Sequence, residues 1–117
     1  MKKQHLMGLL VAATLSIAGS AFAGTWSPTY LQIANLETAV DGYVVYPGTA
    51  INNPAGCANT SQVFGYASTT AAEKELMSKT LLSAFLANRQ VRLNIASSTC
   101  SSGGYPVYLG VRVDSDN

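Results

Sequence analysis

The chain has 117 residues, of which 48% are hydrophobic and 11% are charged, and its formal net charge at pH 7 is +1. A chain of this length folds as one small domain and cannot bury a large core. So small a positive charge does not supply the basic surface that nucleic-acid binding requires, and we expect no nucleic-acid partner.

Residues 1–23 have the pattern of a cleaved secretory signal peptide. Two lysines precede an apolar run over residues 6–18, and the A-F-A motif at 21–23 is a typical cleavage site. The apolar run is shorter than the roughly 20 residues that span a membrane. We therefore expect a protein exported from a bacterium, periplasmic or secreted, with no membrane span and a mature domain of residues 24–117. That domain has five basic and six acidic side chains and no histidine.

Three strands are predicted in the first half of the mature domain. Residues 30–37 begin with an aromatic residue and carry spaced aliphatic side chains, and residues 42–48 are an aromatic and β-branched run bounded by glycines. Residues 51–61 are rich in Asn, Pro, Gly and Ser, which is typical of a loop. Residues 62–68 form the third predicted strand.

A helix is predicted from Thr70 to Asn88. Thr70 followed by Glu73 is a capping-box pattern. Apolar side chains then recur at helical spacing, at Leu76, Met77, Leu81, Ala84 and Phe85. Leu82 and Leu86 interrupt the polar face, and we interpret them as candidates for an interface between copies of the chain.

Two further strands follow the helix. Residues 90–97 and 106–114 alternate apolar and polar side chains. The second alternation predicts inward side chains at Val107, Leu109, Val111 and Val113, and outward ones at Tyr108, Gly110 and Arg112. The domain is therefore expected to be mostly β with one helix (α+β), in the order β-β-β-α-β-β. That is the order of the five-stranded OB-fold barrel.

Cys57 and Cys100 are the two cysteines of the chain. An exported protein meets an oxidising compartment, where two thiols tend to pair. A nucleophilic cysteine needs a base or a cation beside it, and the mature domain has no histidine. We favour an internal disulfide over a redox-active or intermolecular pair.

Other catalytic chemistry finds little support in the sequence. A Ser-His-Asp triad needs a histidine, and two cysteines are too few ligands for zinc. The acidic residues have local explanations, such as Glu73 in the first helical turn and Asp41 before Gly42 in a turn. We expect no catalytic residue, no metal and no cofactor.

Aromatic residues in and near the loops are the remaining candidates for ligand contact, because an aromatic ring with a polar group suits sugars or peptides. Tyr105 in the glycine-rich loop and the outward Tyr108 are the preferred candidates, and Trp26 and Tyr66 are the others in this set. Asn52 and Asn53 lie in the loop beside Cys57 and can supply hydrogen bonds. The candidate ligand-binding residues are therefore Tyr105, Tyr108, Trp26, Tyr66, Asn52 and Asn53.

The block KELMSKTLLSAFLANRQVRLNI, at residues 74–95, resembles the helix-to-strand unit of the B subunits of the subtilase cytotoxin and pertussis-like toxin type. Trp26 near the mature terminus and the positions of Cys57 and Cys100 are compatible with that family. The resemblance implies an exported OB-fold that assembles into rings, binds glycans and has its helix near the ring centre. No glycan-binding residue is carried over, because the family's sugar-binding serine region has no residue-by-residue match here.

Together these features predict an exported, non-enzymatic binding module for a glycan or a protein surface, assembling as a toxin B-subunit-like homo-oligomer. The alternative is a small periplasmic structural or inhibitory protein that has a polypeptide partner and binds no glycan.

Overall fold

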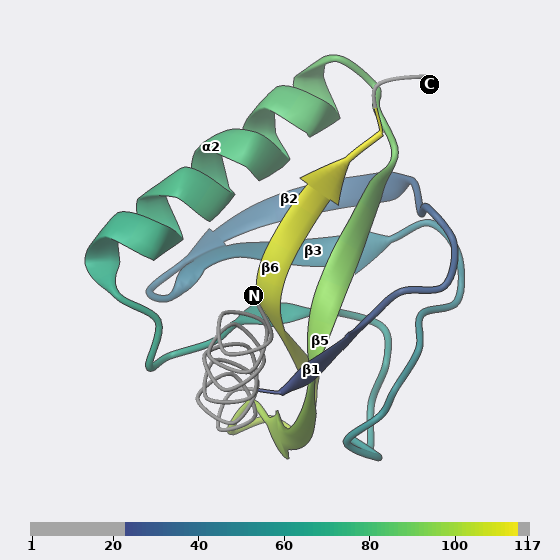
Figure 1. Cartoon of the computed structure of the whole chain (residues 1–117), viewed down its shortest axis with the longest axis vertical. Coiled ribbons are helices and arrows are strands. Elements are labelled where there is room, and N and C mark those ends of the chain that lie inside the picture. The colour runs from purple at the N-terminus through teal and green to yellow at the C-terminus, as the bar shows by residue number, and fades with distance from the viewer. Residues whose placement is uncertain (1–22, 115–117) are drawn as a thin grey trace, which may run out of the picture.

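A computed structural model describes residues 23–114, which form a mixed α+β fold with mostly strands and one helix (Figure 1). The elements in chain order are β1 (Gly24–Trp26), β2 (Ile33–Ala39), β3 (Gly42–Pro47), β4 (Phe64–Gly65), α2 (Ala71–Leu86), β5 (Val91–Cys100) and β6 (Pro106–Val113). The predicted leader lies outside the described residues except for Ala23. Over this range, no helix has the length and apolar character needed to cross a membrane.

The predicted order is partly right. Each of the five predicted strands and the helix is found, but a short additional strand, β1, precedes them and pairs with β5. The third predicted strand, residues 62–68, is reduced to the two residues of β4, with one isolated bridge from Val63 to Val45 beside it.

The strands form two sheets and not one closed barrel. A four-stranded sheet has the order β1-β5-β6-β4, and β2 and β3 form a separate antiparallel hairpin. Single bridges, Leu31–Val91 and Val45–Val63, connect the two sheets. The closed five-stranded barrel is therefore not confirmed, because the short β4 pairs in parallel with β6 and reaches the hairpin only through one bridge.

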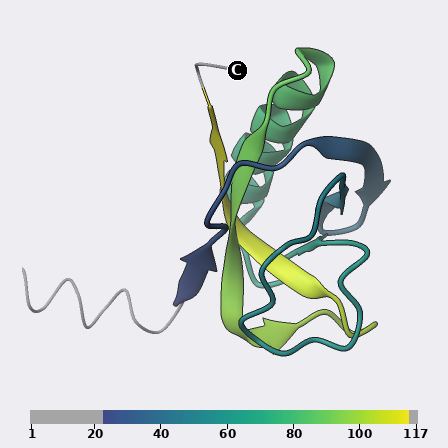
Figure 2. The same ribbon diagram turned by 90° about the vertical axis from the view of Figure 1, so that its right-hand side faces the viewer.

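The core lies where β5 and β6 cross the β2–β3 hairpin and where α2 covers the crossing (Figure 1). The side view in Figure 2 places the hairpin and the long loop between β3 and β4 on one side of β5 and β6. The buried cluster consists of Leu31, Ile33, Val45, Val63, Leu81, Ala84, Val91, Leu93, Ile95 and Tyr108. Apolar side chains from every layer thus share one core.

The cap of α2 is the predicted one. The Thr70 hydroxyl accepts a hydrogen bond from the Glu73 backbone N–H at 3.2 Å and donates to the Glu73 carboxylate at 2.7 Å. The helix ends at Leu86, and Asn88 then adopts a positive φ of 54°. Asparagine tolerates this left-handed conformation at a helix end better than most residues.

The predicted alternation along the last strand is wrong at Tyr108. Asn94 pairs with Gly110, but the next residue, Ile95, pairs with Tyr108, so Leu109 is an extra residue in β6. Such a bulge puts the side chains before it out of phase with those after it, so Tyr108 faces the core although Val111, after the bulge, also packs against it. Tyr108 is therefore in the core, 1% exposed, while Val113 at the strand end is 36% exposed.

The buried hydroxyl of Tyr108 has a partner. It donates a hydrogen bond to the backbone carbonyl of Tyr43 at 2.6 Å, which links β6 to β3. Burial raises the pKa of Tyr108 well above its ordinary value. Tyr108 is a core residue, and the expected outward orientation of its side chain is wrong.

Candidate functional site

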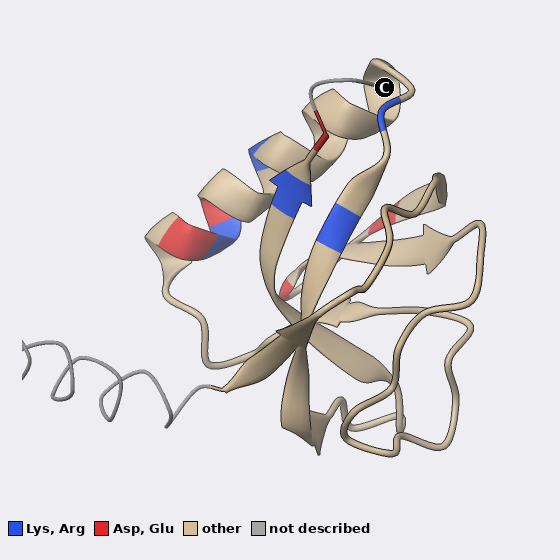
Figure 3. Ribbon diagram, turned by 45° about the vertical axis from the view of Figure 1, so that its right-hand side comes forward, with Lys and Arg blue, Asp and Glu red and all other residues tan. Residues whose placement is uncertain are grey.

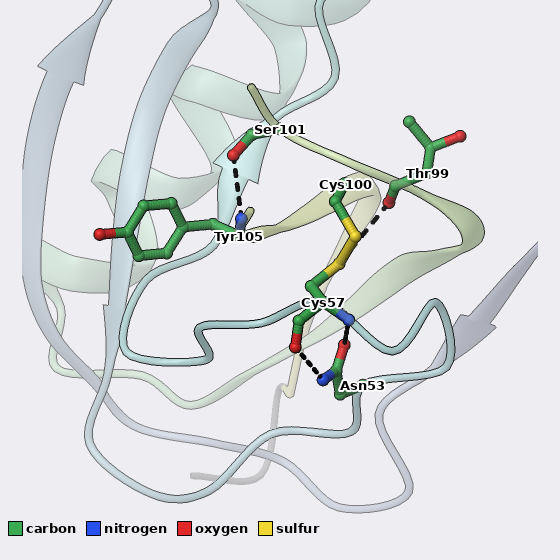
Figure 4. Close-up of a disulfide and its surroundings, with 6 residues drawn as sticks. All are labelled: Asn53, Cys57, Thr99, Cys100, Ser101 and Tyr105. Carbon is green, nitrogen blue, oxygen red and sulfur yellow. Dashed lines mark hydrogen bonds between the residues drawn. A yellow bond between two sulfur atoms is a disulfide. The ribbon is translucent and has the colours of Figure 1, made fainter. Parts of the chain in front are cut away.

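A disulfide joins Cys57 to Cys100, with 5.8 Å between the two Cα atoms (Figure 4). It ties the long loop after β3 to the end of β5, two segments 43 residues apart in the sequence. Both cysteines of the described chain are in this bond. The predicted internal disulfide is confirmed, and it indicates folding in an oxidising compartment.

Asn53 stabilises the loop that carries Cys57. Its side-chain amide donates to the Cys57 carbonyl at 2.8 Å, and its side-chain oxygen accepts from the Cys57 N–H at 2.8 Å (Figure 4). Both polar groups of the side chain are therefore used inside the loop. These two hydrogen bonds give Asn53 a structural role in the loop.

Asn52 faces the other way, toward β1. Its side-chain amide donates to the Thr25 carbonyl at 3.3 Å. Its Oδ1 atom is buried and has no hydrogen-bond partner among the described residues. Asn52 thus attaches the disulfide loop to the first strand instead of facing open solvent.

Tyr105 closes the loop that follows Cys100. Its backbone N–H donates to the Ser101 hydroxyl at 3.1 Å, and its carbonyl accepts from the Ser101 N–H at 2.7 Å. The ring points away from the disulfide (Figure 4) and packs on Phe64 of β4, with 5.0 Å between ring centroids. Tyr105 is half-buried, and its contact with Phe64 holds β4 beside the loop.

A partly open cavity of about 350 Å³ lies next to this loop, between the β2–β3 turn, β4 and the segment after Cys100. Its apolar wall includes Phe64 and Val107, and its polar wall includes Asp41, Ser101 and Ser102. We call it the loop-end cavity; its full lining is Ala39, Val40, Asp41, Gly42, Phe64, Gly65, Ala67, Ser101, Ser102 and Val107. Ligand sites in proteins are typically concave, with apolar walls and a few placed polar groups.

The charge in the loop-end cavity is held in place by the helix. The Asp41 carboxylate is 3.3 Å from the Lys74 ammonium of α2, and the Asp41 side chain is 38% exposed. Gly42, with φ of 104°, forms the tight turn beside it. Gly65 must also be glycine, because a Cβ there would overlap the Asp41 carbonyl oxygen.

The cavity was missed in the sequence for a simple reason. Its polar groups come from segments about 60 residues apart in the chain, and the sequence around Asp41 is explained locally as a turn. The signal that was available was the position of Ser101 and Ser102, directly after a cysteine expected to be bridged. A loop fixed in this way presents its polar groups in one geometry.

A larger hollow of about 420 Å³ lies between the C-terminal half of α2 and the end of β6. Its lining includes Lys79, Arg89 and Val113, and it is more open to solvent than the loop-end cavity. A shallow, open hollow holds a small ligand poorly, so we do not consider it the better candidate.

The remaining predicted ligand residues are not brought to the cavity. Tyr66 lies just beyond β4 in a turn, where its carbonyl accepts from the Thr69 N–H at 3.1 Å. Trp26, in β1, lies on the outer face of the four-stranded sheet beneath Arg112, whose guanidinium carbon is 4.6 Å from the indole centroid. The candidates of the sequence are therefore spread over several parts of the fold.

The described carboxylates have local partners. Glu75 pairs with Lys79 at 3.2 Å, and Glu37 accepts from the Tyr46 hydroxyl at 3.3 Å. Desolvation and the Glu37 carboxylate raise the pKa of Tyr46. Within residues 23–114 there is no group of three or more His, Cys, Asp or Glu side chains placed to hold a metal ion.

No protein-family model matches the chain, and no significant match was found among curated proteins or solved structures.

Proposed function

We propose that residues 24–117 form an exported, non-enzymatic binding module of OB-fold type that holds a glycan in the loop-end cavity. The observation that carries the proposal is the combination of a partly open cavity of about 350 Å³ with a mixed wall, in which five apolar side chains lie beside the three hydrogen-bonding side chains Asp41, Ser101 and Ser102. A sugar ring has this same mixed character, because its C–H face is apolar and its rim carries hydroxyls.

Each wall group has a role in this proposal. The Asp41 carboxylate accepts hydrogen bonds from sugar hydroxyls, and such charge-assisted bonds are stronger than neutral ones. The hydroxyls of Ser101 and Ser102 donate or accept, and Phe64 packs against the apolar face of the ring. The Lys74 ammonium keeps the carboxylate oriented, and the disulfide keeps the serine segment at a constant distance from it.

The resemblance to toxin B subunits supports the proposal in a general way, since that family consists of exported glycan binders. The order of strands and helix around the crossing sheets supports the OB-type architecture. The disulfide supports export to the periplasm or the medium.

The test is a glycan array probed with the purified mature domain, followed by titration of any glycan that binds. We expect Ser102→Tyr to abolish binding, because a large side chain fills the cavity, and Asp41→Asn to weaken it about tenfold by removing a charge-assisted hydrogen bond. Ser98→Tyr is the matched control, since Ser98 is exposed on β5 and does not line the cavity.

Two results would contradict the proposal. One is a mature domain that folds, keeps its disulfide and binds no glycan. The other is a glycan whose affinity is unchanged by Ser102→Tyr, because the site would then lie elsewhere on the molecule.

A second candidate function is a polypeptide-binding protein, and the exposed leucines of α2 favour it. Leu76, Leu82 and Leu86 are 66%, 38% and 75% exposed. A second copy of the chain that packs on Leu82 and Leu86 would cover them. Light scattering at high concentration tests this, and a strict monomer would remove the interface role of both leucines.

A further inference from the structure

The outer face of the four-stranded sheet carries a second set of residues, independent of the loop-end cavity. Leu93 and Ile95 of β5 point into the core, so Arg92 and Asn94 lie on the opposite face. In the register of the sheet, Asn94 is flanked by Trp26 of β1 and by Gly110 of β6.

Two arginines face each other across this sheet. Arg92 and Arg112 are directly paired positions of β5 and β6, and Figure 3 shows the basic segments of the two strands side by side. Like charges opposite each other in an antiparallel pair destabilise it. Neither arginine takes part in the ion pairs Lys74–Asp41 and Lys79–Glu75.

Each arginine lies over an aromatic ring. The guanidinium carbon of Arg92 is 4.6 Å from the ring centroid of Tyr30, and that of Arg112 is 4.6 Å from the centroid of Trp26. Gly110 leaves the space that the indole occupies, since a Cβ there would be 3.2 Å from its Cη2 atom. Stacking of this kind limits the rotamers of the arginines before any partner binds.

The polar groups of this face are not saturated by the chain. Arg92 donates one hydrogen bond to the Pro28 carbonyl at 3.3 Å, while its Nε atom and the Asn94 Oδ1 atom are buried without a partner among residues 23–114. The second arginine, Arg112, is exposed. The face thus presents two guanidinium groups, each placed over an aromatic ring.

We propose that this face, defined by Trp26, Tyr30, Arg92 and Arg112, docks an acidic segment of a partner polypeptide, in which Asp or Glu carboxylates bridge the two arginines. Arginine binds a carboxylate through two parallel hydrogen bonds. One carboxylate between the guanidinium groups of Arg92 and Arg112 therefore relieves their mutual repulsion. Arg, Trp and Tyr are also the residues most enriched at the centres of protein interfaces.

A polypeptide fits this face better than a sugar does. The faces of the two rings are engaged, because each ring has an arginine over it and the indole also contacts Gly110. Stacking of a sugar on Trp26 would require displacement of Arg112. Neither the loop-end cavity nor the hollow beside α2 is lined by these four side chains, so the face lacks the enclosure of a small-molecule site.

The experiment uses Trp26, the chain's single tryptophan, as its reporter. The mature domain is titrated with a synthetic peptide that alternates glutamate and serine, while tryptophan emission is recorded. We expect a saturable change that weakens as salt is added and an affinity that falls about tenfold in Arg112→Gln. Arg112→Lys keeps the charge but loses the planar guanidinium group. Its affinity for the peptide should lie between the affinities of the wild type and Arg112→Gln.

Lys79→Gln is the matched control, because it removes the same charge from an exposed position on α2. Equal weakening by Lys79→Gln would show that only net charge matters and would overturn the proposal. So would the absence of a saturable signal with the glutamate peptide in a folded, oxidised wild-type domain. A sulfated oligosaccharide that binds more tightly than the peptide, with the same dependence on Arg112, would replace the polypeptide partner by an acidic glycan.

Discussion

The two candidate surfaces of this domain are built in different ways. The loop-end cavity consists of backbone turns and short side chains, held by the disulfide, by Asn53 and by the Asp41–Lys74 ion pair. The outer face of the sheet consists of long side chains that lie on a regular strand register. The cavity therefore depends on covalent and backbone constraints, whereas the sheet face depends on side-chain stacking. This difference predicts which changes damage which surface.

The largest effect is expected from removal of the disulfide. In the chain-entropy model, a closed loop of 43 residues stabilises the domain by about 4 kcal/mol. We expect the double variant Cys57→Ala, Cys100→Ala to lose most of this amount in urea unfolding. If this variant folds at low temperature, we expect it to lose glycan binding while the fluorescence emission of Trp26 on the sheet face stays unchanged. Equal stability of the variant and the wild type would contradict the role given to the bond.

Glycine substitutions compare the two surfaces directly. Gly65→Ala forces the new methyl group against the Asp41 carbonyl oxygen, and we expect a loss of about 1–3 kcal/mol, because backbone must move. Gly110→Ala meets side-chain atoms of Trp26 and Asn94 and no backbone, and we expect a change within about 0.5 kcal/mol, together with a shift in tryptophan emission. Chemical unfolding of both variants measures this, and a larger loss for Gly110→Ala would reverse the comparison.

A smaller effect is expected at Tyr108, which lies in the core between the two surfaces. Its folded pKa is raised above the unfolded value of 10.0, so the native state keeps the proton to a higher pH than the unfolded state does. The contribution of Tyr108 to the free energy of unfolding should therefore be constant below pH 10 and fall as the pH rises above that value.

Tyr108→Phe should reduce that alkaline loss and cost about 1 kcal/mol at neutral pH, because the Tyr43 carbonyl loses its donor. Urea midpoints at neutral and alkaline pH measure both effects. If Tyr108→Phe loses as much stability at alkaline pH as the wild type does, that loss would be caused by other tyrosines.

Elements with strong local signals could be predicted from the sequence. The Thr70–Glu73 cap and the helical spacing after it define α2 to within two residues at its end, and the alternation from Val91 onward predicts β5. The pairing of the two cysteines followed from the compartment and from the absence of histidine in the mature domain. In each case the deciding interactions lie within a few residues or involve only one possible partner.

The failures all involve contacts distant in sequence. The bulge at Leu109 turns Tyr108, the residue before it, toward the core, and the strict alternation of the sequence hides this bulge. The strand β1 is only three residues long and exists because β5 has a free edge. The stacking of Arg112 on Trp26 joins residues at opposite ends of the domain, and no local pattern marks it.

The measurement that tests the central claim most directly is titration of the oxidised mature domain with the best glycan from the array, in parallel for Ser102→Tyr and Ser98→Tyr. The proposed function predicts wild-type affinity for Ser98→Tyr and no detectable binding for Ser102→Tyr, with both variants equally stable. Undiminished binding by Ser102→Tyr, or equal losses in the two variants, would contradict a glycan site in the loop-end cavity.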